Sequence, residues 1–221
     1  MQCCPAKEVR VVLEGVAPRK RRSPKRAAVL RAATEEFLSK GFGGTSMDRV
    51  AEAAQVSKRT VYDHFPSKED LFEAIVKETL QKIDQMPVHE YSSERGIEEQ
   101  LLEIGQTFAE TITDSDFIKV SKVLVACFAQ FPEWGRSTLT AYARLRRDMI
   151  AFFKAGKKDG RLRVRNAEGA ATQFVGLIKE FAYWPAVIAH SAPLTSRERK
   201  AVVRDAVSLF LDHYGIDERR K

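Results

Sequence analysis

Apolar residues recur at intervals of three and four positions along most of the chain, the spacing that gathers them on one face of an α-helix. One such stripe consists of Ile97, Leu101, Ile104, Phe108 and Ile112. No segment shows the sustained alternation of apolar and polar residues that is typical of a half-buried β-strand. The pattern therefore predicts an all-α fold of about nine helices.

Side chains that cap free backbone N–H groups mark the expected helix starts. In chain order, these N-cap residues are Ser23, Thr45, Ser57, Ser67, Asn166 and Thr195. Asp48 and Glu198 follow Thr45 and Thr195 by three positions, the spacing of a reciprocal capping box. A long helix is expected over 132–158. The expected ends lie at Gly41, Pro87, Gly160 and Gly215, with a kink or end near Pro185.

The segment 45–65 reads TSMDRVAEAAQVSKRTVYDHF and predicts two capped helices with a tight break at Gln55, which is a helix-turn-helix. The second helix turns Val61 and Phe65 inward. Its opposite side presents Lys58, Arg59, Thr60, Tyr62 and His64. A short helix of this kind places its N-terminal end in a DNA major groove, where Arg and Lys reach guanine edges or phosphates.

Residues 25–76 resemble the N-terminal domain of the TetR/AcrR family of transcriptional regulators. The similar segments are AVLRAATEEFLSKGFGGTS, MDRVAEAAQVSKRTVYDHF and PSKEDLFEAIV. The resemblance implies a DNA-binding domain over 23–85 that contains a helix-turn-helix at about 46–65. It also implies a helical effector-binding and dimerisation domain over 86–221.

The resemblance implies a set of DNA-binding residues, in which Thr45 or Ser46 and Lys68 anchor phosphates. The full set is Thr45, Ser46, Ser57, Lys58, Arg59, Thr60, Tyr62, His64 and Lys68. Two residues depart from the family pattern. Gln55 stands where a turn glycine is frequent, and a positive φ there would cost up to about 1 kcal/mol. Arg59 stands where glycine is common and adds a bulky hydrogen-bond donor.

The charge of the chain is unevenly distributed. The formal net charge is +7, and residues 19–31 contain seven basic residues and no acidic one. Such a run is compatible with a solvated tail, but its place before the first helix favours a basic arm over 1–22 that contacts DNA phosphates or the minor groove. Lys25 and Arg26 extend this basic set into the first helix.

The cysteines and the apolar runs bear on the cellular setting. Cys3, Cys4 and Cys127 form neither a disulfide framework nor a zinc spacing. No apolar run has the length of a membrane span, and we see no signal peptide. We expect a protein of the bacterial cytosol and nucleoid, with no membrane association, no metal and no cofactor.

Aromatic residues are frequent in the second half of the chain. A stripe of this kind is more often core than ligand pocket, but a sensing domain is expected to hold a pocket for an apolar or aromatic effector. The candidates for effector binding are Phe108, Phe128, Trp134, Tyr142, Phe153, Phe174 and Phe181. Glu180 is expected on the solvated side of its helix, and Cys127 in the core.

The last two long helices, 166–188 and 195–214, are capped and broadly apolar, which favours a two-fold dimer. The expected interface residues are Phe174, Ile178, Val202, Ala206, Leu209 and Phe210. The chain is thus expected to be a ligand-responsive repressor that binds an inverted-repeat operator on double-stranded DNA as a homodimer. Two alternatives are an architectural DNA-binding protein and an enzyme with an appended DNA-binding domain, although residues 90–221 show no catalytic constellation.

Overall fold

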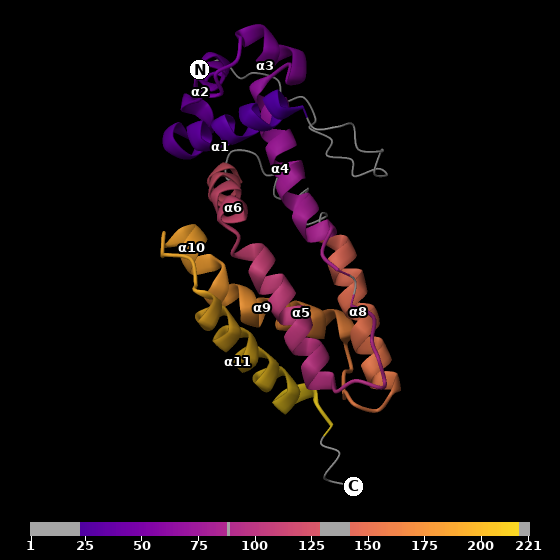
Figure 1. Ribbon diagram of the computed structural model, residues 1–221. Coiled ribbons are helices and arrows are strands. Elements are labelled where there is room, and N and C mark those ends of the chain that lie inside the picture. Colours follow the sequence, from indigo (N-terminus) through magenta and orange to yellow (C-terminus); the bar gives the residue numbers. More distant parts are fainter. Residues whose placement is uncertain (1–22, 88, 129–141, 217–221) are drawn as a thin grey trace. The chain divides into compact units, whose positions relative to one another are not determined.

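The structure is a computed structural model, and it describes residues 23–87, 89–128 and 142–216. Within these ranges the chain forms ten α-helices and no β-strand, so the predicted all-α fold is confirmed (Figure 1). The expected number of helices was nine. The difference arises at Pro185: the preceding helix ends at Ala182, one of the two expected outcomes, and Pro185 stands in the first turn of a separate helix of five residues.

The described residues fall into two compact units, one formed by 23–80 and 119–128 and the other by 81–118 and 142–216. The first unit contains α1 (Pro24–Gly44), α2 (Met47–Ala53) and α3 (Lys58–His64). Two helices run from one unit into the other: α4 (Lys68–Asp84) and α6 (Ser115–Cys127).

Three phenylalanine rings form the centre of the first unit. Phe37 and Phe42 lie on either side of the break in α1, and their ring centroids are 5.5 Å apart. Phe72 of α4 contacts both, at 5.4 and 5.5 Å. Gly41 makes this packing possible, because its φ of +69° interrupts the helix at the end that the sequence predicts.

The second unit contains five helices. They are α5 (Ile97–Ile112), α8 (Ala143–Lys158), α9 (Ala167–Ala182), α10 (Trp184–Ile188) and α11 (Ser196–Tyr214). Phe153, Phe174 and Phe210 meet at its centre, with centroid separations of 4.9 to 6.2 Å. Helices α5 and α11 approach closely at Gly105, where a Cβ atom would lie 2.6 Å from Cγ1 of Val203.

Most of the predicted helix starts are confirmed. The Ser57 hydroxyl accepts the Thr60 N–H at 3.1 Å, and the Ser67 hydroxyl accepts the Asp70 N–H at 3.0 Å. Asn166 caps α9, and Thr195 with Glu198 forms the expected capping box of α11. Ser23 precedes α1, but its side chain makes no capping hydrogen bond.

The predicted start of the second helix at Thr45 is wrong by one residue. Ser46 is the N-cap, and its hydroxyl accepts the Arg49 N–H at 3.3 Å. Thr45 is buried, and its hydroxyl donates to the Gly41 carbonyl at 2.9 Å. Asp48 therefore does not complete a capping box with Thr45. Both residues can cap, and packing against α1 decides between them.

The remaining helices agree with the pattern where the structure describes them. Helix α8 begins at Ala143, and the expected part of that helix before 142 lies outside the described residues. Cys127 is 3% exposed and Glu180 is exposed, as expected. Across the part of the chain that the structure covers, the helices are too short or too polar to cross a membrane.

Candidate nucleic-acid interface and ligand cavity

Helices α2 and α3 are joined by a tight turn at Ala54, Gln55 and Val56. The Gln55 N–H bonds to the Glu52 carbonyl and the Val56 N–H to the Ala51 carbonyl, both at 3.0 Å. These bonds satisfy carbonyl groups that the end of α2 would otherwise leave free. Gln55 has a φ of +54°, so the residue that replaces the turn glycine does adopt the left-handed conformation.

Helix α3 has one buried and one exposed side. Val61 is 0% exposed and Phe65, which ends the helix, is 3% exposed, so the predicted inward positions are confirmed. Lys58, Arg59 and His64 are exposed, and Tyr62 is 48% exposed. The packing of two residues thus fixes which side of the helix can meet a partner.

Lys58 and Arg59 are the two cations at the start of α3. The Lys58 Nζ donates to the Asp48 Oδ2 at 2.7 Å, and this hydrogen bond raises the pKa of Lys58. Arg59 extends into solvent, with 90% of its side chain exposed and its Nε 3.9 Å from the Asp63 Oδ2. Arg59 is therefore only loosely held in the free protein.

The candidate phosphate anchors Lys68, Thr45 and Ser46 differ in their exposure and in their contacts within the protein. The Lys68 ammonium donates to the Thr45 carbonyl at 3.2 Å and lies 4.6 Å from the centroid of the Phe42 ring. Thr45 is buried, whereas Ser46 is exposed. Lys68 and Thr45 thus fix the junction between α1 and α2, which orients the N-terminal end of α2.

The two basic residues of α1 lie in different surroundings. Lys25 is exposed. Arg26 forms an ion pair with Glu78, and its guanidinium lies 5.2 Å from the centroid of the Phe65 ring. Arg26 therefore links α1 to α4 and to the end of α3. The basic arm 1–22 lies outside the described residues.

The aromatic residues proposed for effector binding are dispersed. Phe108, Phe153 and Phe174 are buried, Phe181 is 62% exposed, and Phe128 is half-buried just after α6. Burial raises the pKa of Tyr142, whose ring centroid lies 5.5 Å from the Lys179 Nζ. Trp134 lies outside the described residues.

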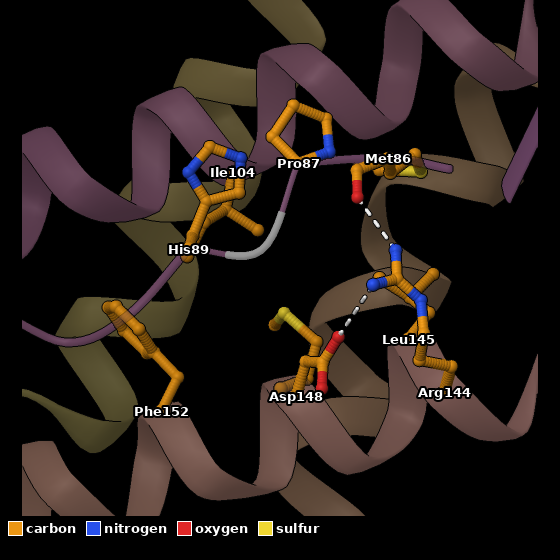
Figure 2. A pocket seen from close by; sticks show the side chains of 9 residues that line it. Met86, Pro87, His89, Ile104, Arg144, Leu145, Asp148 and Phe152 are labelled. Carbon is orange, nitrogen blue, oxygen red and sulfur yellow. Dashed lines mark hydrogen bonds and ion pairs between the residues drawn. The ribbon is translucent and has the colours of Figure 1, made fainter. Parts of the chain in front are cut away.

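A small cavity does lie in the second unit, and none of the six described aromatic candidates lines it. Its walls come from the segment after α4, from α5 and from α8 (Figure 2). The lining residues are Met86, Pro87, His89, Ile104, Arg144, Leu145, Asp148, Met149 and Phe152. Sequence reasoning missed its polar residues, because each stands alone in a segment without a motif.

The expected dimer residues are mostly used inside the protomer. Phe174, Ile178, Ala206 and Phe210 are at most 3% exposed, so they form the core of the second unit. The expected residues come from the apolar stripes of α9 and α11, and in the structure those stripes face the interior of the protomer. Val202 is half-buried, and only Leu209, which is 58% exposed, offers a large apolar surface to a partner.

Comparison with known families accounts for most of the described chain. Residues 29–75 match the bacterial regulatory proteins of the tetR family. Residues 99–216 match the family described as the AefR-like transcriptional repressor, C-terminal domain.

Solved structures with similar folds include other regulators. A TetR family transcriptional regulator from Pseudomonas syringae pv. tomato str. DC3000 is 39% identical, with a TM-score of 0.71, over 87% of this chain and 98% of that chain. The flavonoid-responsive regulator FrrA is 27% identical, with a TM-score of 0.64, over 86% of this chain and 97% of that chain.

A curated relative is the HTH-type transcriptional regulator YhgD of Bacillus subtilis (strain 168). It is 29% identical over 142 residues, which are 60% of this chain. The match spans 66% of the length of that relative. All three relatives are regulators, which points to a regulator and away from an enzyme.

Proposed function

Since the chain belongs to the TetR family of bacterial DNA-binding transcriptional regulators, we propose that it is a homodimeric repressor of an inverted-repeat operator, released by a small apolar or aromatic effector. One observation supports DNA binding above all others. The start of α3 exposes Lys58 and Arg59 while Val61 and Phe65 anchor the other side of the helix. Such a helix can lie in the major groove with its cations toward base edges and phosphates.

The proposed operator symmetry follows from the size of the reading surface. Helix α3 has seven residues and can contact only a few base pairs. Two copies related by a two-fold axis would read two half-sites, and the site would then be an inverted repeat. The surfaces of α9 and α11 around Leu209 are the proposed contact between protomers.

The proposed response to an effector relies on the continuity of α4. This helix begins in the first unit, directly after the helix-turn-helix, and ends at Asp84 in the second. Met86 follows that end and lines the cavity. A ligand that moves the segment after α4 would alter α4 itself, and through it the placement of α3. The similar regulator FrrA is flavonoid-responsive, and flavonoids are aromatic molecules, which supports an aromatic effector here.

The proposal is tested on DNA selected from a random library by the wild-type protein. The selected sequences should contain an inverted repeat. Lys58→Ala and Arg59→Ala should each weaken binding to them by about 1–3 kcal/mol without loss of helix content. Lys157→Ala, which removes an exposed charge from α8, is the matched control and should bind normally. Unchanged affinity in both α3 variants would overturn the assignment of the reading helix.

A further inference from the structure

The cavity beside the end of α4 combines an apolar wall with three polar side chains. Met86, Met149 and Phe152 supply apolar surface, and His89, Arg144 and Asp148 supply polar groups (Figure 2). The cavity has a volume of about 20 Å³, which is room for one water molecule. A site with this composition selects its ligand through the few polar groups that still lack a partner.

Arg144 is not free to bind an anion. Its Nη2 donates to the Met86 carbonyl at 2.7 Å, and its Nε lies 3.2 Å from the Asp84 Oδ1 in a geometry that makes no hydrogen bond. Its Nη1 lies 3.9 Å from the Asp148 Oδ2. Two carboxylates therefore face one guanidinium, which leaves no surplus positive charge for an acidic ligand.

Besides Arg144, whose Nε makes no hydrogen bond, His89 is a lining residue with a buried polar atom that lacks a partner among the described residues. Its side chain is 18% exposed, and its Nε2 is buried without a hydrogen-bond partner among the described residues. A buried polar atom without a hydrogen-bond partner is unfavourable, because it has lost its contact with water. His89 lines the cavity together with Ile104 and Pro87 (Figure 2). A ligand that paired with Nε2 would remove this cost.

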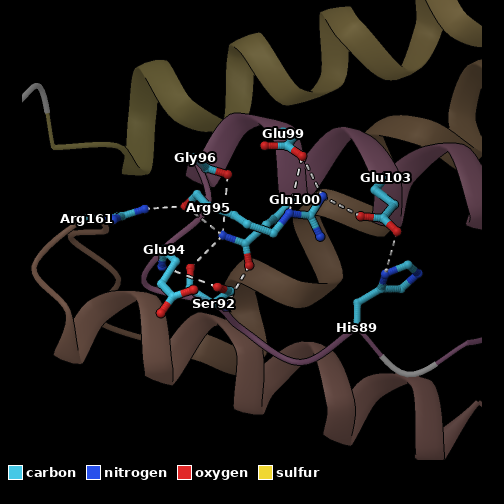
Figure 3. A network of polar contacts seen from close by, with 9 residues as sticks. All are labelled: His89, Ser92, Glu94, Arg95, Gly96, Glu99, Gln100, Glu103 and Arg161. Atoms are coloured by element: carbon cyan, nitrogen blue, oxygen red, sulfur yellow. Dashed lines mark hydrogen bonds and ion pairs between the residues drawn. The ribbon is translucent and has the colours of Figure 1, made fainter.

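The surroundings of the His89 Nδ1 indicate whether Nε2 donates or accepts a hydrogen bond. The Nδ1 of His89 lies 3.8 Å from the Glu103 Oε1 (Figure 3). Arg95 donates to the other oxygen of Glu103 at 2.8 Å, and this hydrogen bond lowers the pKa of Glu103. The Glu103 carboxylate accepts hydrogen bonds and donates none, so a His89 ring that carries a single N–H has it on Nδ1, facing Glu103. Nε2 is then an acceptor.

We propose that this cavity binds a neutral, mainly apolar small molecule whose hydroxyl group donates a hydrogen bond to the His89 Nε2, which makes the effector a phenol or an alcohol and excludes an acid. The inference rests on the proposed function, since it names the ligand class of the effector-responsive unit. A ligand larger than water enters by displacing Met86 and Met149, whose unbranched side chains readily adopt other rotamers. Phe152 then supplies apolar surface to the apolar part of the ligand.

The first experiment uses the wild-type protein and three para-substituted toluenes of similar size: p-cresol, its methyl ether p-methylanisole, and p-toluate. Binding is measured by isothermal titration calorimetry. The expected order is p-cresol first, with p-methylanisole weaker by about tenfold, the ratio for one lost hydrogen bond. The anion p-toluate should be weaker still. Equal binding of p-cresol and its ether, the tightest binding by p-toluate, or no binding of p-cresol would each overturn the proposal.

The second experiment compares two histidine variants. His89→Leu removes the acceptor and should abolish the preference for p-cresol over its ether while retaining apolar binding. His213→Leu removes an exposed histidine of α11 and should leave the preference unchanged. A preference that persists in His89→Leu would overturn the role of Nε2. The wild-type probe series does not depend on either variant being folded.

Failure of this inference is distinguishable from failure of the proposed function. DNA binding by the ligand-free protein is measured separately on the selected library. A protein that binds DNA without preferring p-cresol overturns only the ligand class. A protein that prefers p-cresol but binds no DNA overturns only the proposed function.

Discussion

Lys58 of α3 and Asp48 of α2 form a hydrogen bond across the helix-turn-helix, with Nζ and Oδ2 2.7 Å apart. Both side chains are more than half exposed, at 66% and 57%. The ion pair therefore contributes little to stability in water. The ion pair matters for DNA binding instead, because the Asp48 carboxylate neutralises the Lys58 ammonium, which is proposed to contact DNA.

Asp48→Asn is expected to strengthen DNA binding. The substitution removes a negative charge from the proposed interface and frees the Lys58 ammonium for a phosphate. Fluorescence anisotropy over a range of salt concentrations should show tighter binding and a log–log salt slope steeper by about 0.9, the value of one added phosphate contact. Asp212→Asn removes the same charge from an exposed site on α11 and is the control. Weaker binding by Asp48→Asn would show that Asp48 instead positions Lys58 for its contact.

Gln55 stores strain at the turn of the motif, because a residue with a side chain has a φ of +54° there. Gln55→Gly should raise the free energy of unfolding by up to about 1 kcal/mol, since glycine adopts this conformation without a steric cost. Gln55→Val should lower it, because a β-branched residue at positive φ is a severe outlier. Urea denaturation at a fixed protomer concentration measures both. Changes of the same sign in the two variants would contradict the strain argument.

Local chemistry explains why so many helix starts were predictable. A cap depends on residues within four positions of one another, as with Ser57 and Thr60 or Thr195 and Glu198. Thr45 and Ser46 have equivalent local chemistry, so only the burial of Thr45 against α1 separates them. The inward positions Val61 and Phe65 were predictable for the same reason, because helical periodicity sets them.

Contacts between distant segments were not predictable from the pattern. Periodicity placed Phe153, Phe174 and Phe210 on apolar faces but did not show that the three rings pack on one another. It also gave no reason to group His89 with Arg144, which come from different segments and meet only in the folded unit. An apolar stripe shows which side of a helix is covered and leaves open whether the covering surface is the same protomer or another.

Gly105 is expected to be essential to the packing of α5 against α11. A Cβ atom there would lie 2.6 Å from the Val203 Cγ1. Val203 is β-branched and strongly prefers one χ1 rotamer in a helix, so its side chain cannot change rotamer without an energetic cost. Gly105→Ala should lower the free energy of unfolding by about 1–3 kcal/mol. Gly176→Ala in α9 meets no atom within 4 Å and should raise it by roughly 0.5–1 kcal/mol through helix propensity. Thermal unfolding of the two variants checks the contrast, and stabilisation of Gly105→Ala would refute the close approach.

Apolar residues that are exposed in the protomer test dimerisation better than the buried residues of the apolar stripes. Large apolar side chains are exposed on or near the last helices, at Phe181, Leu209 and Ile188. Phe210 is 2% exposed, so Phe210→Asp would place a charge in the protomer core and unfold the chain whatever the interface is. Leu209 is the informative position, because its side chain is 58% exposed in the protomer.

Leu209→Asp is therefore expected to give folded monomers. Burying an unpaired carboxylate between protomers costs several kcal/mol, whereas the isolated protomer should lose little stability because the Leu209 side chain is 58% exposed in it. Sedimentation velocity at micromolar concentration should show a monomer with unchanged helix content by circular dichroism, and binding to an inverted repeat should weaken far more than binding to a half-site. Arg204→Asp changes a residue of α11 that lines a cleft with Leu102 and Gln106 of α5, and it should remain dimeric. A Leu209→Asp protein that still sediments as a dimer would place the interface elsewhere.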